Sequence, residues 1–361
     1  MIKRHKRMVF VSLLTVLLLV TSGCGLLTEK TTNEIDPPQE VDYLEEGEKL
    51  DQGNKEQETA AGGKDAPVGA TDSNQRQVYL IDKNDMVVPQ VLQVPKSDKP
   101  AKQVVEYLVE DSKVTNQLPD GMRAVLPAGT EVLSLNIEQG TATVDFSKEF
   151  KQYAPEDEMR ILQSLTYTLT QFDNVNNVKV QINGKDQKVM PVNHTPIGDG
   201  LTRENGINIE TSGVVDVTNS DTVTVYFLAQ NDKEQVYYVP VTRRVPSTDN
   251  LVKATVDELI TGPSQQSGLV TEVHNTVELV TAPVIEDGVV TLNFNKAILG
   301  QNENTAISES VLNSLVLSLT EVEGIDKVAL KVNGQTEVLK ESGKMLTEPV
   351  SRPANVNTVE F

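Results

Sequence analysis

One segment of the chain occurs twice. Residues 162–184 read LQSLTYTLTQFDNVNNVKVQING, residues 312–334 read LNSLVLSLTEVEGIDKVALKVNG, and the two align without a gap. The two copies are identical at Leu162/Leu312, Ser164/Ser314, Leu165/Leu315, Leu169/Leu319, Thr170/Thr320, Val178/Val328 and Asn183-Gly184/Asn333-Gly334. The duplication predicts two domains of one fold. It also tests catalytic candidates, because a reactive residue present in one copy and absent from the other is suspect unless only one copy is active.

Hydrophobic periodicity predicts the same order of elements in both halves. In the first half, strands are expected over 78–81, 86–94, 131–137, 141–146 and 177–182, with helices over 99–109 and from Pro155 to about Phe172. In the second half, strands are expected over 222–228, 235–241, 289–294 and 326–332, with helices over 251–261 and 306–320. The inward face of the helix after Pro155 is expected to carry Met159, Leu162, Leu165, Leu169 and Phe172. Mixed strands with two helices predict an α+β fold, each domain a small mixed sheet with both helices on one face.

The N-terminus has the pattern of a secretory signal. A basic start is followed by an apolar stretch over 8–20, which at roughly 13 residues is too short to span a bilayer. Thr21-Ser22-Gly23-Cys24 then resembles the lipobox of bacterial lipoproteins, with Thr21 where leucine is usual. Cys24 is the only cysteine of the chain, so it has no disulfide partner within it. We therefore expect a signal peptide over 1–23 and an acyl chain on Cys24 that anchors the protein in the membrane.

Residues 24–76 combine this lipidated cysteine with an acidic linker that has almost no aliphatic runs. Such a composition cannot bury enough apolar surface to fold, so the linker is expected to be disordered. As a flexible coil its ends would lie roughly 35–42 Å apart. We expect the first folded domain with its arm over 77–220 and the second over 221–361.

The duplication also includes a segment after each domain, which we call its arm; in the first copy it extends from Pro191 to Ser220. Leu201-Thr202-Arg203 followed by Ile207-Asn208 recurs as Val350-Ser351-Arg352 followed by Val356-Asn357. The first arm is expected to pack on its domain and to fix the two domains relative to each other. Arg203 and Arg352 are candidates for a structural hydrogen-bonding role or for binding a partner.

The composition excludes several functions. A net charge of −20 argues against nucleic-acid binding, because phosphates would be repelled. No Cys/His cluster, P-loop, GxSxG elbow or GxGxxG fingerprint is present, so no metal, nucleotide or cofactor site is expected. His194 and His274 stand in different copies without a shared motif. We therefore expect no catalytic residue.

The strongest remaining enzyme candidate is a carboxylate pair of the glycosidase type. Asp145 is the most suggestive acid because it lies at the end of a predicted strand, but its counterpart in the second copy is Asn293. An amide cannot act as acid or base, so Asp145 is expected to have a structural role.

Several of these features together resemble the GerMN-domain family. They are the strand ends Asp145-Phe146-Ser147 and Asn293-Phe294-Asn295, the leucine-rich second helix, and the final strand ending in Asn-Gly, all behind a lipoprotein signal. Segments 35–39 and 347–353 also look like those of the sporulation and germination lipoproteins that carry this domain. The resemblance implies a fold similar to the ring-building modules of secretion systems. It also implies a non-enzymatic assembly role in the channel complex that links mother cell and forespore, at the outer forespore membrane facing the intermembrane space.

Three functions stay open at this point. The first is a lipid-tethered scaffold that binds proteins of the channel complex. The second is an extracytoplasmic enzyme acting on peptidoglycan of the spore cortex or in germination, which requires two carboxylates in one cleft. The third is a small-ligand sensor, which requires a deep apolar pocket between the domains.

Overall fold

The computed structural model describes residues 75–112, 118–211, 216, 218–300 and 305–357. In this part of the chain no helix has the length and apolar character needed to cross a membrane. Cys24 and the acidic linker lie outside the described residues, so their predicted roles stay predictions.

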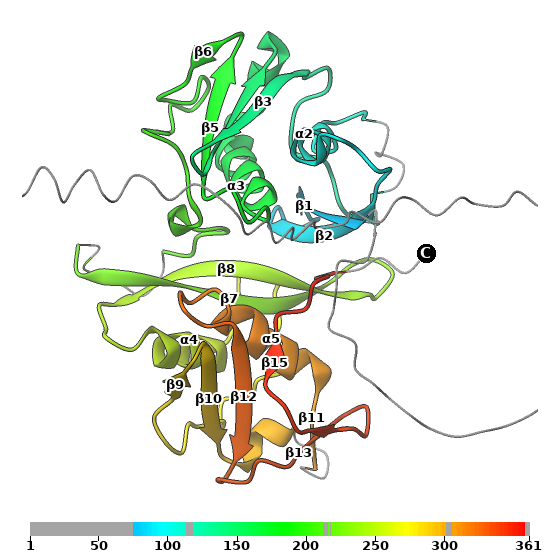
Figure 1. Cartoon of the computed structure of the whole chain (residues 1–361). Coiled ribbons are helices and arrows are strands. Elements are labelled where there is room, and N and C mark those ends of the chain that lie inside the picture. The colour runs from blue at the N-terminus through cyan, green and yellow to red at the C-terminus, as the bar shows by residue number, and fades with distance from the viewer. Residues whose placement is uncertain (1–74, 113–117, 212–215, 217, 301–304, 358–361) are drawn as a thin grey trace, which may run out of the picture. The chain divides into compact units, whose positions relative to one another are not determined.

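The first domain follows the predicted order of elements (Figure 1). Its strands are β1 (Gln75–Ile81), β2 (Val87–Gln93), β3 (Val132–Glu138), β4 (Thr141–Phe146), β5 (Asn177–Ile182) and β6 (Lys185–Asp186). Its helices are α2 (Pro100–Glu106) and α3 (Glu158–Leu169), with short 3₁₀ turns η2 (Lys148–Lys151) and η3 (Pro155–Asp157), and η4 (Arg203–Asn205) lies in the first arm.

The second domain repeats this order with short additional strands. Its strands are β7 (Ser220–Gln230), β8 (Val236–Pro246), β9 (Val284–Glu286), β10 (Val289–Phe294), β11 (Ala306–Ile307), β12 (Lys327–Val332), β13 (Val338–Lys340), β14 (Met345–Leu346) and β15 (Val350–Ser351). Its helices are α4 (Leu251–Thr261) and α5 (Glu309–Leu319), with the 3₁₀ turn η5 (Lys296–Leu299).

Each domain has a four-stranded mixed sheet around a parallel pair of strands, and the second domain adds the small sheet β11-β13-β14. The orders are β3-β4-β5-β6 in the first domain and β9-β10-β12-β15 in the second. Strand β4 pairs parallel with β5 from Thr141↔Asn177 to Phe146↔Ile182, and β10 pairs with β12 in the same way. Alternate residues of β4 are buried, as the period of a half-buried strand requires. The predicted α+β fold of two tandem domains is confirmed.

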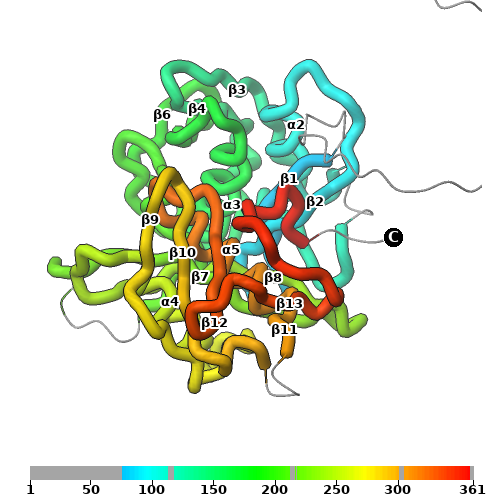
Figure 2. The backbone as a smooth tube through the Cα atoms, turned by 60° about the horizontal axis from the view of Figure 1, so that its bottom comes forward, coloured from blue at the N-terminus to red at the C-terminus, as the bar shows by residue number. Residues whose placement is uncertain are grey.

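The first two strands of each domain form a separate hairpin rather than joining the mixed sheet. Helix α3 contacts both β5 and β1, and α5 contacts both β12 and β7, so the helices lie between sheet and hairpin (Figures 1 and 2). A hairpin alone is marginally stable in water, and packing on the helices covers its apolar face. The two hairpins then meet through β2 and β8.

The limits of three helices and one inward position differ from the expectations. Helix α2 ends at Glu106 rather than at residue 109, and α3 extends over Glu158–Leu169 rather than from Pro155 to about Phe172. The second long helix begins at Glu309 rather than at residue 306, because the Ser308 hydroxyl accepts a hydrogen bond from the Val311 N–H and caps the helix. The preceding Ala306–Ile307 pairs with β13 instead. In α3, Met159 is 44% exposed, while its neighbour Glu158 is fully buried. The first turn of α3 therefore turns a carboxylate inward where the pattern predicted methionine.

Candidate functional site: the junction of the two domains

The junction is built where the repeated hairpins face each other. Pro89 in β2 and Pro240 in β8 occupy equivalent positions, opposite Tyr79 and Tyr226 of their hairpins. Proline has no N–H to donate, so it weakens any direct backbone ladder between β2 and β8. Side chains of the two arms supply the connection instead.

Asn208 of the first arm joins the two hairpins. Its Oδ1 accepts from the Val87 N–H at 2.8 Å, and its Nδ2 donates to the Val87 carbonyl at 2.7 Å. The same Nδ2 donates to the Pro240 carbonyl at 2.8 Å. One amide side chain thus satisfies both backbone groups of Val87 in β2 and reaches β8 of the other domain.

Asn357 of the second arm makes the mirror arrangement. Its side chain bonds both backbone groups of Tyr238 in β8, at 2.7 and 2.8 Å, and donates to the Pro89 carbonyl of β2 at 2.8 Å. Both asparagines have a left-handed backbone, with φ of 47° at Asn208 and 59° at Asn357, a region that asparagine tolerates better than most residues.

Each arm also pairs with the hairpin of the other domain. In the first arm, the Glu210 N–H donates to the Thr242 carbonyl of β8, and the Thr242 N–H donates to the Ile207 carbonyl. In the second arm, the Asn357 carbonyl accepts from the Val91 N–H of β2. Figures 1 and 2 show the red C-terminal residues reaching β1 and β2. The exchange is reciprocal, so neither arm belongs to one domain alone.

The two candidate arginines meet at one carboxylate. Arg352 donates to Glu321 Oε1 at 2.8 Å, and Arg203 donates to Glu321 Oε2 at 3.3 Å. Each arginine also donates to the last-turn threonine of its own domain's helix, Thr170 or Thr320, at 2.9 Å. The structure therefore places Arg203 and Arg352 together, as equivalent residues of the two copies.

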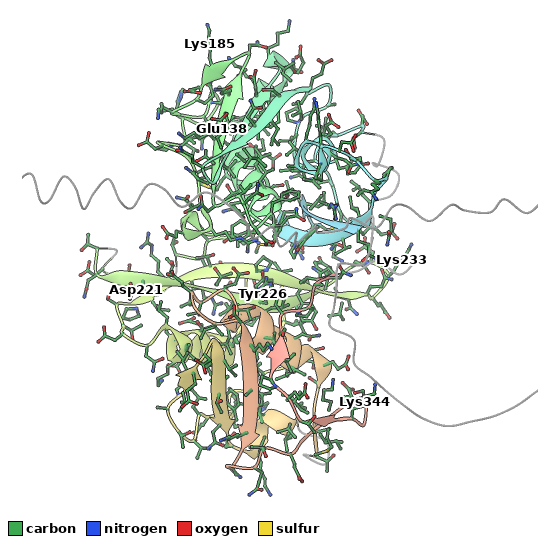
Figure 3. All side chains as sticks on the ribbon, viewed as in Figure 1. Glu138, Lys185, Asp221, Tyr226, Lys233 and Lys344 are labelled. Carbon is green, nitrogen blue, oxygen red and sulfur yellow. The ribbon has the colours of Figure 1, made fainter. Side chains whose placement is uncertain are left out.

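Buried tyrosines pack against these charges, among them Tyr226, which Figure 3 labels. The guanidinium of Arg203 lies 4.7 Å from the ring centre of Tyr167, and that of Arg352 lies 5.2 Å from the ring centre of Tyr226, both in cation–π range. Burial raises the pKa of Tyr226 well above its ordinary value. Its hydroxyl, which stays protonated, donates to Glu321 Oε1 at 2.9 Å.

Glu321 is the asymmetric member of this cluster. Its counterpart in the first copy is Gln171, whose amide is used on the backbone of Gln77 in β1. Burial alone would raise the pKa of Glu321, but Arg352 and Arg203 outweigh it and hold that pKa below its ordinary value. One ionised carboxylate thus serves two cations from two arms.

Hydroxyl groups on the helices form hydrogen bonds with the backbone groups at the outer edges of the hairpins. In the first domain, Thr168 accepts from the Tyr79 N–H, and Ser164 donates to the Tyr79 carbonyl. In the second, Ser318 accepts from the Tyr226 N–H at 2.9 Å. Serine and threonine are poor helix formers, but here they give a buried strand edge its hydrogen-bond partners.

Turn residues add polar contacts at the periphery of the junction. The Tyr237 hydroxyl donates to the buried carboxylate of Asp82 at 2.8 Å, and Lys83 pairs with Asp232 at 2.6 Å. Lys233 of the second domain forms an ion pair with Asp120 of the first, so each domain supplies one lysine and one aspartate. The exposed pairs contribute little stability, so we assign the strength of the junction to the arms.

The structure gives Asp145 a structural task. Its carboxylate accepts from the Gly184 N–H at 2.9 Å, and Asn293 accepts from the Gly334 N–H at 2.8 Å. Each side chain caps the Asn-Gly turn that follows the neighbouring parallel strand. Only an acceptor is needed there, which is why acid and amide interchange between the copies.

The other reactive candidates stay apart. His194 is exposed at the start of the first arm, while His274 lies in the second domain and forms a hydrogen bond with Thr276. Within the described ranges no group of three or more His, Cys, Asp or Glu could hold a metal ion.

Sequence reasoning missed Asn208, Asn357 and Glu321 as junction residues. The two asparagines carried a signal, because Arg-x-x-x-(Ile/Val)-Asn recurs in both arms. Glu321 carried none, since the first copy has Gln171 in its place.

Replacing Asn208 with alanine is expected to lower the free energy of unfolding by about 2 kcal/mol, because three backbone groups lose their partner. Asn357→Ala should have a similar effect, which urea unfolding monitored by circular dichroism would measure. Asn355→Ala is the matched control, since that exposed side chain makes one bond to Gln75. Equal effects of all three variants would contradict a bracing role.

Comparison with known proteins places these features in context. Residues 77–188 and 224–338 match the family model described as "Germane: Sporulation and spore germination". The chain is 46% identical over 372 residues to the spore germination protein GerM of Bacillus subtilis (strain 168), covering all of both chains. The solved structure of the tandem GerMN domains of that protein matches with a TM-score of 0.76 and 50% identity, over 80% of this chain and all of that one.

Proposed function

Since the chain belongs to the Germane family of sporulation and spore-germination proteins, with tandem GerMN domains and a sporulation-related role, we propose that it is a non-enzymatic, membrane-tethered scaffold. In this proposal it supports assembly or localisation of the channel complex between mother cell and forespore. Its position would be the outer forespore membrane, facing the intermembrane space.

The observation that carries the proposal is the reciprocal exchange of arms. The hairpins of the two domains are joined by asparagines at equivalent positions of the two arms, so the two domains make one compact unit. The charged side chains that could have served in catalysis form structural hydrogen bonds instead: Asp145 accepts from a turn N–H, and Glu321 accepts from the two arginines. A body of this kind suits the binding of other proteins better than the conversion of a substrate.

Membrane attachment through Cys24 is part of the proposal. Replacing Cys24 with serine is expected to release the protein from the membrane fraction, because the serine hydroxyl does not accept the acyl chain that the lipobox directs to cysteine. Cell fractionation with immunoblotting, and mass spectrometry of the N-terminal peptide, would measure this. Ser22→Ala is the matched control. Membrane retention of an unlipidated Cys24→Ser protein would contradict the anchor.

The decisive experiment for the scaffold is crosslinking in sporulating cells, followed by identification of the captured proteins. We expect components of the channel complex. Release of muropeptides by the purified protein, without capture of any channel component, would instead support the peptidoglycan-acting enzyme.

A further inference from the structure

We propose that the outer edge of β3 in the first domain binds an extended segment of another protein by strand addition. The segment would carry lysine or arginine near both ends. This inference rests on the proposed function, because it names the surface through which the scaffold holds a partner.

Strand β3 ends its sheet, and no described residue pairs with its outer side. An edge strand turns alternate N–H and C=O groups outward, where another strand can meet them. Three residues of β3 pack on the core: Val132 is buried, whereas Leu135 and Ile137 are only partly buried. Ala142 and Val144 of the neighbouring β4 are fully buried. At its start β3 packs against α2, Val132 is buried, and the pairing register shifts between Val132 and Ser134. The part of the edge that is open to a partner therefore runs from Ser134 to Glu138.

The equivalent edge of the second domain is interrupted. Glu138 faces Thr141 in the first domain as Glu286 faces Val289 in the second, so the two edge strands are in the same register. Counting back from these acids, Pro283 takes the place of Leu135. Strand β9 has three residues, because a proline cannot donate to a ladder and guards an edge against pairing. Strand addition is therefore assigned to the first domain.

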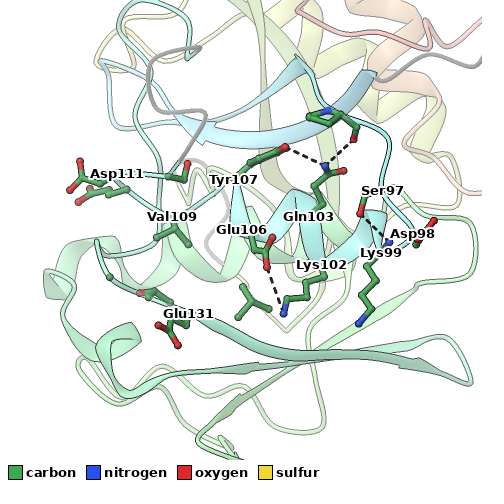
Figure 4. A pocket seen from close by; sticks show the side chains of 16 residues that line it. Ser97, Asp98, Lys99, Lys102, Gln103, Glu106, Tyr107, Val109, Asp111 and Glu131 are labelled. Carbon is green, nitrogen blue, oxygen red and sulfur yellow. Dashed lines mark hydrogen bonds and ion pairs between the residues drawn. The ribbon is translucent and has the colours of Figure 1, made fainter.

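Charge selects the kind of strand that fits. Glu131 and Glu138 are exposed at the two ends of the edge, with Glu138 labelled in Figure 3 and Glu131 in Figure 4. If two copies of the chain paired antiparallel and centred on this edge, Glu131 of each would face Glu138 of the other. Like charges directly opposite destabilise a strand pair, whereas cations at those places stabilise it. A basic segment of a different protein is thus favoured over a second copy.

A groove beside the start of β3 extends the acidic surface (Figure 4). It has a volume of about 1100 Å³ and lies between α2 and the start of β3. Acids outnumber bases among the charged residues of its lining, which are Asp98, Glu106, Glu110, Asp111 and Glu131 with Lys99 and Lys102. Lys102 of the lining is already paired with Glu106, at 3.6 Å. The buried hydroxyl of Thr130, also in the lining, has no hydrogen-bond partner among the described residues. A long basic side chain at this end of an added strand would find both room and opposite charge.

The test uses the full chain in detergent with a synthetic peptide, Lys-Thr-Val-Ser-Val-Thr-Val-Lys. Hydrogen exchange followed by mass spectrometry should show slower exchange over 134–138 and no change over 284–286. Fluorescence anisotropy should show binding about tenfold weaker for the same peptide with glutamate at both ends, and added salt should reduce the difference. The double variant Glu131→Lys/Glu138→Lys should reverse this preference.

A single variant tests the edge without a peptide. In Glu138→Lys, Glu131 of one copy would face the new lysine at position 138 of a second copy, so the two edges could pair. Analytical ultracentrifugation should therefore detect concentration-dependent dimers. The double variant places lysine opposite lysine and should not form them. Equal binding of both peptides, or protection over 284–286 instead of 134–138, would overturn the inference.

The outcomes distinguish the inference from the proposed function. If the double variant still crosslinks to channel components in sporulating cells, while the basic peptide leaves β3 unprotected, the edge assignment is wrong and the scaffold stands. If the peptide binds β3 but no channel component is captured from any variant, the scaffold proposal fails and the edge assignment stands.

Discussion

Replacing Glu321 with alanine is expected to lower the free energy of unfolding by about 3 kcal/mol, because two arginines are left at the junction without their carboxylate. The side chain of Glu321 is 12% exposed, and those of Arg203 and Arg352 are 34% and 28% exposed, so water compensates only part of the loss. Urea unfolding monitored by circular dichroism would measure the change. Hydrogen exchange should also become faster in both arms, over 203–210 and 350–357.

Two variants serve as controls for this prediction. Glu323→Ala removes a neighbouring exposed carboxylate and should change stability by less than about 0.5 kcal/mol. Glu321→Gln introduces the residue that the first domain has at this position, Gln171. Its free energy of unfolding should lie between those of Glu321→Ala and Glu323→Ala, because an amide oxygen can still accept hydrogen bonds. If Glu321→Ala unfolds at the same urea concentration as Glu323→Ala, the shared carboxylate does not stabilise the junction.

Replacing Glu158 with glutamine is expected to lower the free energy of unfolding by a similar amount, about 3 kcal/mol at pH 7. The carboxylate accepts hydrogen bonds from the backbone N–H groups of Val192, Asn193 and Thr195 and from the Tyr153 hydroxyl, at 2.7–3.1 Å. An amide group offers one acceptor oxygen and places its NH₂ against these donors. The first arm begins at this point, so the variant should loosen it.

The Glu158 contribution should depend on pH in a defined direction. Burial alone would raise the pKa of Glu158, but the hydrogen bonds from Thr195, Asn193 and Tyr153 outweigh it and lower that pKa to about 2. A depressed carboxyl pKa stabilises the fold above the ordinary value near 4.5, and that stability is lost as pH falls toward 2. Unfolding of wild type and Glu158→Gln should therefore differ at pH 7 and converge toward pH 2.

Glu156→Gln provides the control, since Glu156 is exposed on the preceding 3₁₀ turn. Its unfolding should match the wild type at both pH values. A constant difference between wild type and Glu158→Gln from pH 7 to pH 2 would show that the variant acts by packing rather than by charge.

Local elements were predicted well where short-range signals agreed. Helix α4 over 251–261 and strand β10 over 289–294 were predicted at their observed limits, because alternation and helical period were both clear there. The Asn-Gly pairs correctly marked turns, and Asn183 has the left-handed φ of 49° that such a turn requires. The beginning of α5 was missed because the cap at Ser308 competes with a pattern that continues to residue 306.

The junction was less accessible to sequence reasoning. Tandem domains follow from the duplication, but the sequence does not state which sheet a hairpin joins, since pairing depends on which edge is free. Met159 illustrates the same limit. The helical period predicted that its side chain faces inward, but the structure buries Glu158 instead, because the backbone N–H groups of Asn193 and Thr195 in the first arm supply hydrogen bonds to that carboxylate.

The sequence by itself determined the repeat, the order of elements, the absence of a recognisable catalytic motif and the family. These depend on residue spacing and composition, which are local properties of the chain. Only the tertiary structure decided that the arms cross to the opposite hairpins, that Arg203 and Arg352 share Glu321, and that β3 keeps a free edge. These depend on which distant groups can satisfy one another's hydrogen bonds and charges once water is excluded, and no spacing along a single chain encodes that pairing.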